Sequence, residues 1–134
     1  MQLADTNIVS ELMRRLPHAG VMRWAESLDR LQRPIQISAL TVDEIMFGLR
    51  RKPDPAKSAW FERFLELNLV LPATTEVARR AGQMRAEFSL KGSAREQADM
   101  LIAATAQVHA LTLVTRNVRD FDGCGITVLN PFEG

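Results

Sequence analysis

Short apolar segments alternate with longer amphipathic segments along the whole chain, and this alternation restricts the fold more than any other feature. The short segments are rich in Leu, Ile and Val and fit strands; they lie at residues 1–4, 35–38, 69–71, 111–115 and 126–129. Between them, apolar residues recur every three or four positions, as in helices that bury one face. Strands that alternate with helices predict an α/β fold with a mainly parallel sheet covered on both faces.

The same spacing, together with signals at the helix ends, places the expected helices. They lie at residues 8–15, 21–31, 41–49, 56–67, 75–88 and 93–108. Two of them open with the Ser/Thr-x-x-Glu pattern of a capping box, from Thr41 to Glu44 and from Ser93 to Glu96. We therefore expect Thr41 and Ser93 to cap these two helices.

The composition excludes several classes of protein. A chain of 134 residues with 46% hydrophobic and 25% charged residues is expected to form a single domain over residues 1–134. A net charge of +1 excludes a nucleic-acid binder that works through overall charge. One cysteine, Cys124, and two histidines exclude a disulfide within the chain and a zinc site of several cysteines. No apolar run approaches the ~20 residues of a membrane span, and we expect a protein of the reducing cytoplasm.

Three acidic residues stand where folds of this kind bind ligands, which is beyond the carboxyl ends of the strands. Asp5 follows the first expected strand, Glu44 lies in the first turn of the helix after the second strand, and Asp99 interrupts the apolar segment 97–104. Two carboxylates ~4 Å apart repel by roughly 4 kcal/mol at an effective dielectric constant of about 20. A hard divalent cation, Mg²⁺ or Mn²⁺, would offset this repulsion and supply a bound water as a nucleophile toward a phosphate.

Each of these acids also has a purely structural interpretation. Asp5 suits a helix cap, and Glu44 occupies the last position of an expected capping box. Asp99 is harder to explain in this way, because an unpaired carboxylate inside a buried helix is costly. The residues alone therefore leave open whether the acids hold a metal or serve the fold, and they do not identify a substrate.

Four blocks of the sequence resemble the PIN-domain ribonucleases, and within them the VapC-like and FitB-like toxins of bacterial toxin–antitoxin systems. The blocks are residues 3–12, 38–49, 98–106 and 113–121, the last followed by 128–132. The resemblance spans nearly the whole chain and implies a PIN-like three-layer α/β/α sandwich. It implies that Asp5, Glu44 and Asp99 are catalytic metal ligands. It also implies a homodimer and a VapB-like antitoxin whose C-terminal segment covers the acidic pocket.

The fourth acidic position differs between members of the family that the chain resembles. Some have an Asp directly after Thr-Arg, where this chain has Asn117, and others have the acid three residues later, here Asp120. We expect Asp120 to be the fourth catalytic and metal-binding acid, directly or through water, with Asn117 orienting it. Thr115 is expected to hydrogen-bond to the carboxylates and Asn7 to hold Asp5. Whether the site takes one metal or two stays open.

The expected function is that of a metal-dependent endoribonuclease, the toxin of a VapBC-type pair, with tRNA as the kind of RNA that the resemblance suggests. Arg116 and Arg119 flank the fourth acidic position and are expected to contact the RNA backbone. The alternative is a non-catalytic PIN-like module that only binds RNA or a partner. A phosphatase with Asp5 as its nucleophile is disfavoured, because the usual second Asp two residues later is Asn7.

Overall fold

The computed structural model describes residues 1–133, so Gly134, the last residue of the expected domain, lies outside the described residues. The described part contains five strands: β1 (Gln2–Ala4), β2 (Gln36–Ser38), β3 (Leu69–Leu71), β4 (Thr112–Val114) and β5 (Val128–Leu129). It also contains six α-helices, α1 (Thr6–Leu12), α2 (Ala19–Arg30), α3 (Ala39–Arg51), α4 (Pro55–Leu67), α5 (Thr75–Leu90) and α6 (Gln97–Val108), and the 3₁₀ helices η1 (Val118–Phe121) and η2 (Pro131–Glu133). Every strand and α-helix overlaps the range predicted for it. Within residues 1–133 no helix has the length and apolar character needed to cross a membrane.

The five strands form one sheet in the order β3-β2-β1-β4-β5, and each pairing between them is parallel. Strand β1 lies at the centre, with Leu3 opposite Gln36 of β2 on one side and Leu113 of β4 on the other. Because all strands run the same way, their carboxyl ends meet at one edge of the sheet. The expected parallel α/β fold is confirmed, and the residue that follows β1 comes to lie between the ends of β2 and β4.

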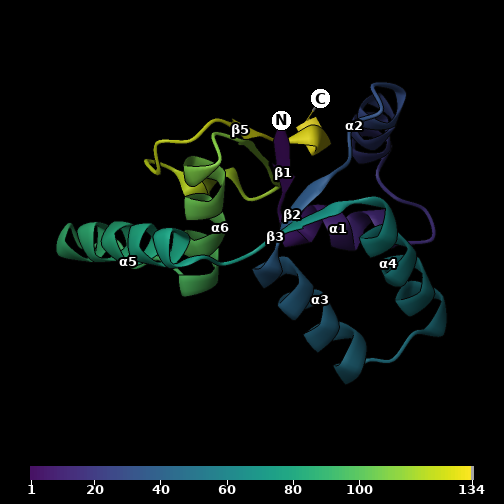
Figure 1. Ribbon diagram of the computed structural model, residues 1–134, viewed down its shortest axis with the longest axis horizontal. Coiled ribbons are helices and arrows are strands. Elements are labelled where there is room, and N and C mark those ends of the chain that lie inside the picture. The colour runs from purple at the N-terminus through teal and green to yellow at the C-terminus, as the bar shows by residue number, and fades with distance from the viewer. Residues whose placement is uncertain (134) are drawn as a thin grey trace.

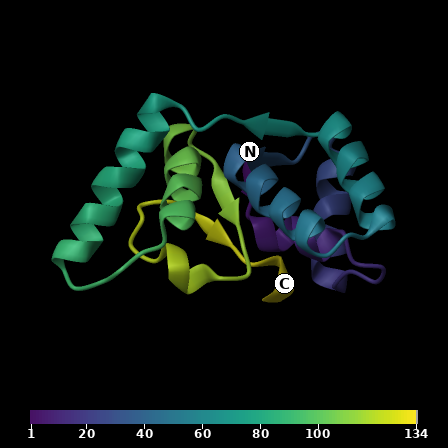
Figure 2. The ribbon, with the colours of Figure 1, turned by 90° about the horizontal axis from the view of Figure 1, so that it is seen from below.

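Helices cover both faces of the sheet. Side chains alternate along a strand, so Leu3 and Leu113 face one side of the sheet and Ala4 and Val114 the other. The first pair belongs to a core cluster with residues of α5 and α6, and the second to a cluster with residues of α1 to α4. Figures 1 and 2 show α5 and α6 on one side of the strands and α1 to α4 on the other. The three-layer α/β/α sandwich is confirmed.

Neither predicted capping box forms. Helix α3 begins directly after β2, and its capping residue is Ser38, whose Oγ accepts a hydrogen bond from the Leu40 amide at 3.0 Å. Thr41 is therefore inside the helix, where it is buried. Helix α6 begins only at Gln97, because the Ser93 hydroxyl accepts a hydrogen bond from Arg95 Nε instead of a helix amide. Residues 93–96 are thus a loop.

The C-terminal segment closes the sheet next to β4. The side-chain amide of Asn130 donates to the carbonyl oxygen of Arg116 at 3.4 Å, and the amide of Thr115 donates to the carbonyl oxygen of Leu129 at 2.9 Å. Phe132 of η2 packs against the His18 ring, with 4.9 Å between the ring centroids. These contacts fix the backbone that leaves the carboxyl end of β4.

Candidate active site

Asp5 lies at the junction of the central strand and the first helix. Its backbone amide donates to the carbonyl oxygen of Val114 at 2.9 Å, which extends the pairing of β1 with β4 by one residue. Its Oδ1 accepts from the Thr6 amide at 2.7 Å, so Asp5 also caps α1, as its structural interpretation predicts. The side chain is only 5% exposed. The carboxylate is therefore held at the carboxyl edge of the sheet.

Two side chains expected to hold Asp5 do so. The hydroxyl of Thr115, fully buried at the end of β4, donates to Asp5 Oδ2 at 2.8 Å. The side-chain amide of Asn7 donates to the same oxygen at 3.1 Å and lies 3.2 Å from Thr115 Oγ1. The expected contacts of Thr115 and Asn7 are confirmed. They tie together residues from the ends of neighbouring strands that lie more than a hundred positions apart in the sequence.

The segment after β4 is bound to the same network through its main chain. The Arg116 amide donates to Asn7 Oδ1 at 3.1 Å, and the Asn117 amide donates to Thr115 Oγ1 at 3.0 Å. The backbone of Asn117 thus supports Asp5 through the Thr115 hydroxyl. Asn117 also lines the hollow described below. A substitution of the Asn117 side chain would leave these bonds in place.

Glu44 faces α1 from the second turn of α3. Thr6 Oγ1 donates to Glu44 Oε1 at 2.6 Å, and the hydroxyls of Thr6 and buried Thr41 are hydrogen-bonded at 3.0 Å. The interpretation of Glu44 as the end of a capping box is wrong, because α3 begins at Ala39. Sequence reasoning missed Thr6, since nothing in the pattern shows that α1 and α3 lie side by side.

Asp99 lies in the first turn of α6 and is half-buried. It lies in the apolar segment 97–104, directly before Met100, the first buried residue of this helix. The pKa of Asp99 is raised to about 6, first by burial and then by the charges of Asp5, Asp120, Glu44 and Glu96, in that order. The predicted acids therefore lie close enough together to repel one another. The positive end of the helix dipole favours a negative charge at this position.

Asp5 experiences the same repulsion. Burial raises its pKa, and the Glu44 charge adds to the increase, while the hydrogen bonds from Thr115, Thr6 and Asn7 oppose it. The net direction is upward. A buried carboxylate with three donors would have its charge stabilised, so the raised pKa shows that these donors do not offset the cost of burial.

The acids line one open hollow of about 630 Å³. Its walls include the three predicted ligands Asp5, Glu44 and Asp99 together with Asn117, and the cations Arg14 and Lys57. Arg14 is paired with Glu11 at 3.0 Å. Asp120 is not among the described residues that line the hollow, but its charge raises the pKa of Asp99. The structure thus brings three of the four predicted acids to one surface.

Asp120 is exposed on η1, and Arg95 holds the backbone around it. The Arg95 guanidinium donates to the carbonyl oxygens of Asp120 at 3.1 Å and Asp122 at 2.8 Å. It also lies over the Phe88 ring, 3.8 Å from the centroid. This role of Arg95 could not be predicted from the sequence, because its partners are main-chain atoms, which the residue types do not reveal.

The donor set suits a hard cation, although the side chains do not yet surround one. Among residues 1–133, no three His, Cys, Asp or Glu side chains stand close enough together to hold a metal ion. The acids of the hollow offer only carboxylate oxygens, which Mg²⁺ and Mn²⁺ prefer. The pKa values of Asp5 and Asp99 are raised by burial and, in addition, by the charges of neighbouring acids. The residues fit such a cation by chemistry and charge.

Arg116 and Arg119 are exposed beside this site. The Arg116 guanidinium lies 4.7 Å from the centroid of the Phe132 ring, which holds it near the carboxyl end of β4. Their contact with RNA stays a prediction.

Comparison with known proteins agrees with this fold. Residues 3–123 match the PIN domain family. The chain is 31% identical to VapC ribonuclease Y4jK of Sinorhizobium fredii and 32% identical to toxin FitB of Neisseria gonorrhoeae, with 99% of both chains covered in each case. The crystal structure of FitAcB from Neisseria gonorrhoeae superimposes with a TM-score of 0.87 at 33% identity, covering 100% of both chains. DNA-bound VapBC from Salmonella typhimurium gives a TM-score of 0.85 at 28% identity over 97% of both chains.

Proposed function

This chain belongs to the PIN-domain family, and on that premise we propose that it is the toxin of a VapBC-type toxin–antitoxin pair and cleaves RNA as an endoribonuclease. The observation that carries the proposal is the gathering of Asp5, Glu44 and Asp99 around one hollow at the carboxyl edge of the sheet. Relatives of similar length are named as a VapC ribonuclease and a toxin. An acidic hollow in such a chain suits the hydrolysis of a phosphodiester bond.

The proposed cofactor is Mg²⁺ or Mn²⁺. Asp5, Glu44 and Asp99 would hold it, with Asp120 as the fourth acid, directly or through water. The support is the purely carboxylate donor set, together with the burial and the added repulsion that raise the pKa of Asp5 and of Asp99. When bound, the cation would activate water as the nucleophile and stabilise the charge on the scissile phosphate.

The residues of the chain prepare the site before any cation binds. Thr115 and Asn7 fix the orientation of the Asp5 carboxylate, which otherwise would have to be ordered at the moment of reaction. Thr6 holds Glu44 on the opposite wall, and α6 presents Asp99 from its first turn. Water attacks the phosphorus and the 3′ oxygen departs, so the products carry a 5′ phosphate and a 3′ hydroxyl.

The proposed partners follow from the same family. The substrate is RNA, with tRNA as the first class to test, and the inhibitor is a VapB-like antitoxin. The homodimer expected from the sequence also belongs to this proposal. An RNA substrate places the proposed reaction in the cytoplasm.

The purified protein should cut total RNA or tRNA when Mg²⁺ or Mn²⁺ is present and should stop when the cation is chelated. Sequencing of the product ends should find 5′ phosphates and 3′ hydroxyls. Asp5→Asn serves as the inactive control, because it removes the charge and keeps the side-chain volume. Cleavage that continues in chelator with 2′,3′-cyclic phosphate ends would overturn the metal mechanism. RNA binding with no cleavage under any condition would instead support the non-catalytic alternative.

A further inference from the structure

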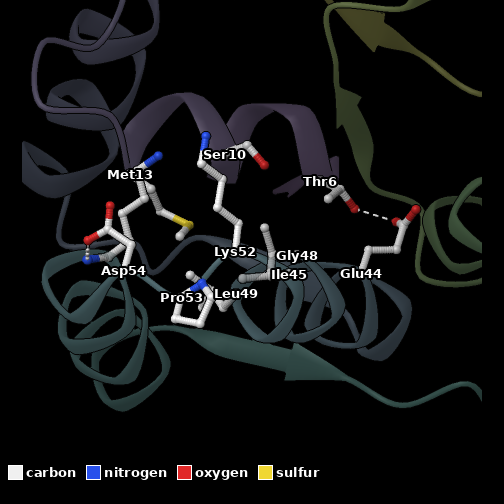
Figure 3. Close-up of a pocket in the computed structure, with 11 residues that line it drawn as sticks. Thr6, Ser10, Met13, Glu44, Ile45, Gly48, Leu49, Lys52, Pro53 and Asp54 are labelled. Carbon is white, nitrogen blue, oxygen red and sulfur yellow. Dashed lines mark hydrogen bonds between the residues drawn. The ribbon is translucent and has the colours of Figure 1, made fainter.

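A second pocket of about 270 Å³ adjoins the acidic hollow, between α1, α3 and the start of α4 (Figure 3). The two spaces share the lining residues Thr6, Ser10, Glu44 and Lys57. The hydrogen bond from Thr6 to Glu44 marks their boundary. We propose that this pocket binds the nucleoside adjacent to the scissile phosphate and so selects the position of the cut. The inference rests on the proposed ribonuclease function, and we refer to the space as the nucleoside pocket.

Position connects the nucleoside pocket to the reaction. An RNA strand held with one phosphate at the acids must place its next nucleoside within a few ångströms of them. The nucleoside pocket is the recess that begins at Glu44, one of those acids. A base that enters it would therefore fix the register of the strand on the catalytic carboxylates.

The floor of the nucleoside pocket suits the apolar face of a base. Ile45 is buried, and Met13 and Leu49 are half-buried. Figure 3 shows the Met13 side chain in the space between α1 and α3. A thioether packs favourably against an aromatic ring, and its flexible chain adapts to different bases. The Ser10 hydroxyl on the wall can donate to or accept from the edge of the base or the ribose.

The rim of the nucleoside pocket suits a phosphate. The chain has three lysines, Lys52, Lys57 and Lys91, and two of them, Lys52 and Lys57, line this pocket. Lys52 extends from the end of α3 across the pocket toward the α1 side in Figure 3. Lysine ammonium groups are common contacts of nucleic-acid phosphates. Lys57 lines both spaces and Lys52 lines only the nucleoside pocket, so positive charge extends from the acids into the pocket and matches a cation-bound phosphate followed by a second phosphate.

Size favours one nucleoside over a bound helix. The pocket volume of about 270 Å³ is close to the lower end of the range for small-ligand pockets, roughly 300 Å³. A helix with its side chains is about 10 Å wide and would need a long groove instead. Gly48 of α3 lines the pocket, and a Cβ built there meets no atom within 4 Å. A larger side chain at this position would therefore enter open space in the pocket without a clash.

Gly48→Leu is the test, because its side chain would occupy the nucleoside pocket while its Cβ meets no atom within 4 Å, and it replaces none of the acids. Leu also suits a helix better than Gly, so the variant should be folded and at least as stable. Gly82→Leu on α5 is the matched control, since a Cβ at Gly82 also meets nothing within 4 Å. On a single-stranded RNA that contains a mapped cut site, Gly48→Leu should raise KM about tenfold and change the base preference at one position beside the cut. Gly82→Leu should match the unmodified protein.

Binding gives a second readout that does not depend on catalysis. In the Asp99→Asn background, the affinity for the same fluorescent RNA should fall with Gly48→Leu and stay unchanged with Gly82→Leu. Lys52→Ala and Lys57→Ala should each reduce the slope of log affinity against log salt by about 0.7, the value for one phosphate contact on a single strand. Lys91→Ala is the matched control and should leave the slope unchanged.

The outcomes separate this inference from the proposed function. If the unmodified protein cuts RNA while Gly48→Leu and Gly82→Leu cut and bind it alike, the nucleoside pocket is wrong and the ribonuclease stands. If the unmodified protein cuts no RNA, both fall. If Gly48→Leu affects only inhibition by the VapB-like antitoxin, the pocket is a peptide site and the inference is overturned.

Discussion

Asp99 is the residue at which repulsion between carboxylates is most evident. Its pKa is raised to about 6 by burial and by neighbouring acids, compared with about 3.9 in an unfolded chain. The folded protein therefore binds a proton at Asp99 more tightly than the unfolded chain does. By linkage, the metal-free protein should become more stable as pH falls from 7 through 6 toward 4, and should lose this gain as pH rises again.

Asp99→Asn should remove this pH dependence. It eliminates the charge with almost no change in volume, so the metal-free variant should be more stable than the unmodified protein at pH 7 by about 1 kcal/mol, a value reduced for solvent screening. RNA cleavage should be lost at the same time. Urea unfolding at pH 5 and pH 7 measures the stability, and an RNA assay in Mg²⁺ measures the cleavage. The control is Asp29→Asn, at an exposed position of α2. A variant that unfolds more easily at pH 7 without metal would mark Asp99 as structural.

The fourth acid can be identified by comparing Asp120 with Asn117. Asp120 raises the pKa of Asp99 through its charge, whereas Asn117 supports Asp5 through its backbone amide. Asp120→Asn should therefore weaken Mn²⁺ binding and turnover strongly, and Asn117→Ala should cost less, because its amide bond to Thr115 persists. Titration calorimetry with Mn²⁺ and single-turnover cleavage test the ranking. The reverse ranking would transfer the fourth position to Asn117.

At the scale of elements, sequence periodicity located the strands and helices but misplaced two helix starts. Periodicity reports which residues are buried, and burial decides where an element exists. The start of a helix depends on whether a nearby hydroxyl bonds to a free helix amide or to another partner. Ser38 took the role expected of Thr41, and Ser93 bonded to Arg95 instead of a helix amide. Such competition depends on the loop backbone, which the residue types do not specify.

The caps differ in what they should contribute to stability. Ser38→Ala removes the acceptor for the Leu40 amide at the start of α3 and should lower the free energy of unfolding by about 1 kcal/mol. Ser93→Ala should cost less, because Ser93 caps no helix and bonds only to an arginine side chain. Urea unfolding of both variants checks the difference. Equal losses would mean that Ser93 supports the start of α6 after all.

At the scale of the whole molecule, the site exists because of the strand order. Asp5, Thr115 and Glu44 meet because β1 lies between β2 and β4, and each follows or borders the carboxyl end of its strand. Residue types indicated that acids follow strands, and the family resemblance indicated which acids belong together. Neither the spacing nor the composition contains the order of strands, so the contacts of Thr6 with Thr41 and Glu44 could not be predicted from the sequence.

The balance of charge over the molecule suggests how a partner would inhibit it. The net charge is only +1, yet the acidic hollow holds carboxylates with raised pKa values. An Arg or Lys of an antitoxin would gain charge-assisted hydrogen bonds there and would exclude both cation and RNA.

A peptide from the C-terminal segment of the VapB-like antitoxin should therefore inhibit cleavage. Inhibition should weaken when its basic residue is changed to Ala. Variants of Asp5 and Asp99 cannot be tested by inhibition, because both residues are needed for cleavage. Their contribution to peptide binding is therefore measured directly. The affinity for the peptide should fall with Asp5→Asn or Asp99→Asn and stay unchanged with Asp29→Asn. Calorimetry of peptide binding and inhibition of the unmodified enzyme test these expectations together. Binding that is indifferent to the peptide's basic residue and to both acids would show that the antitoxin blocks RNA access elsewhere on the molecule.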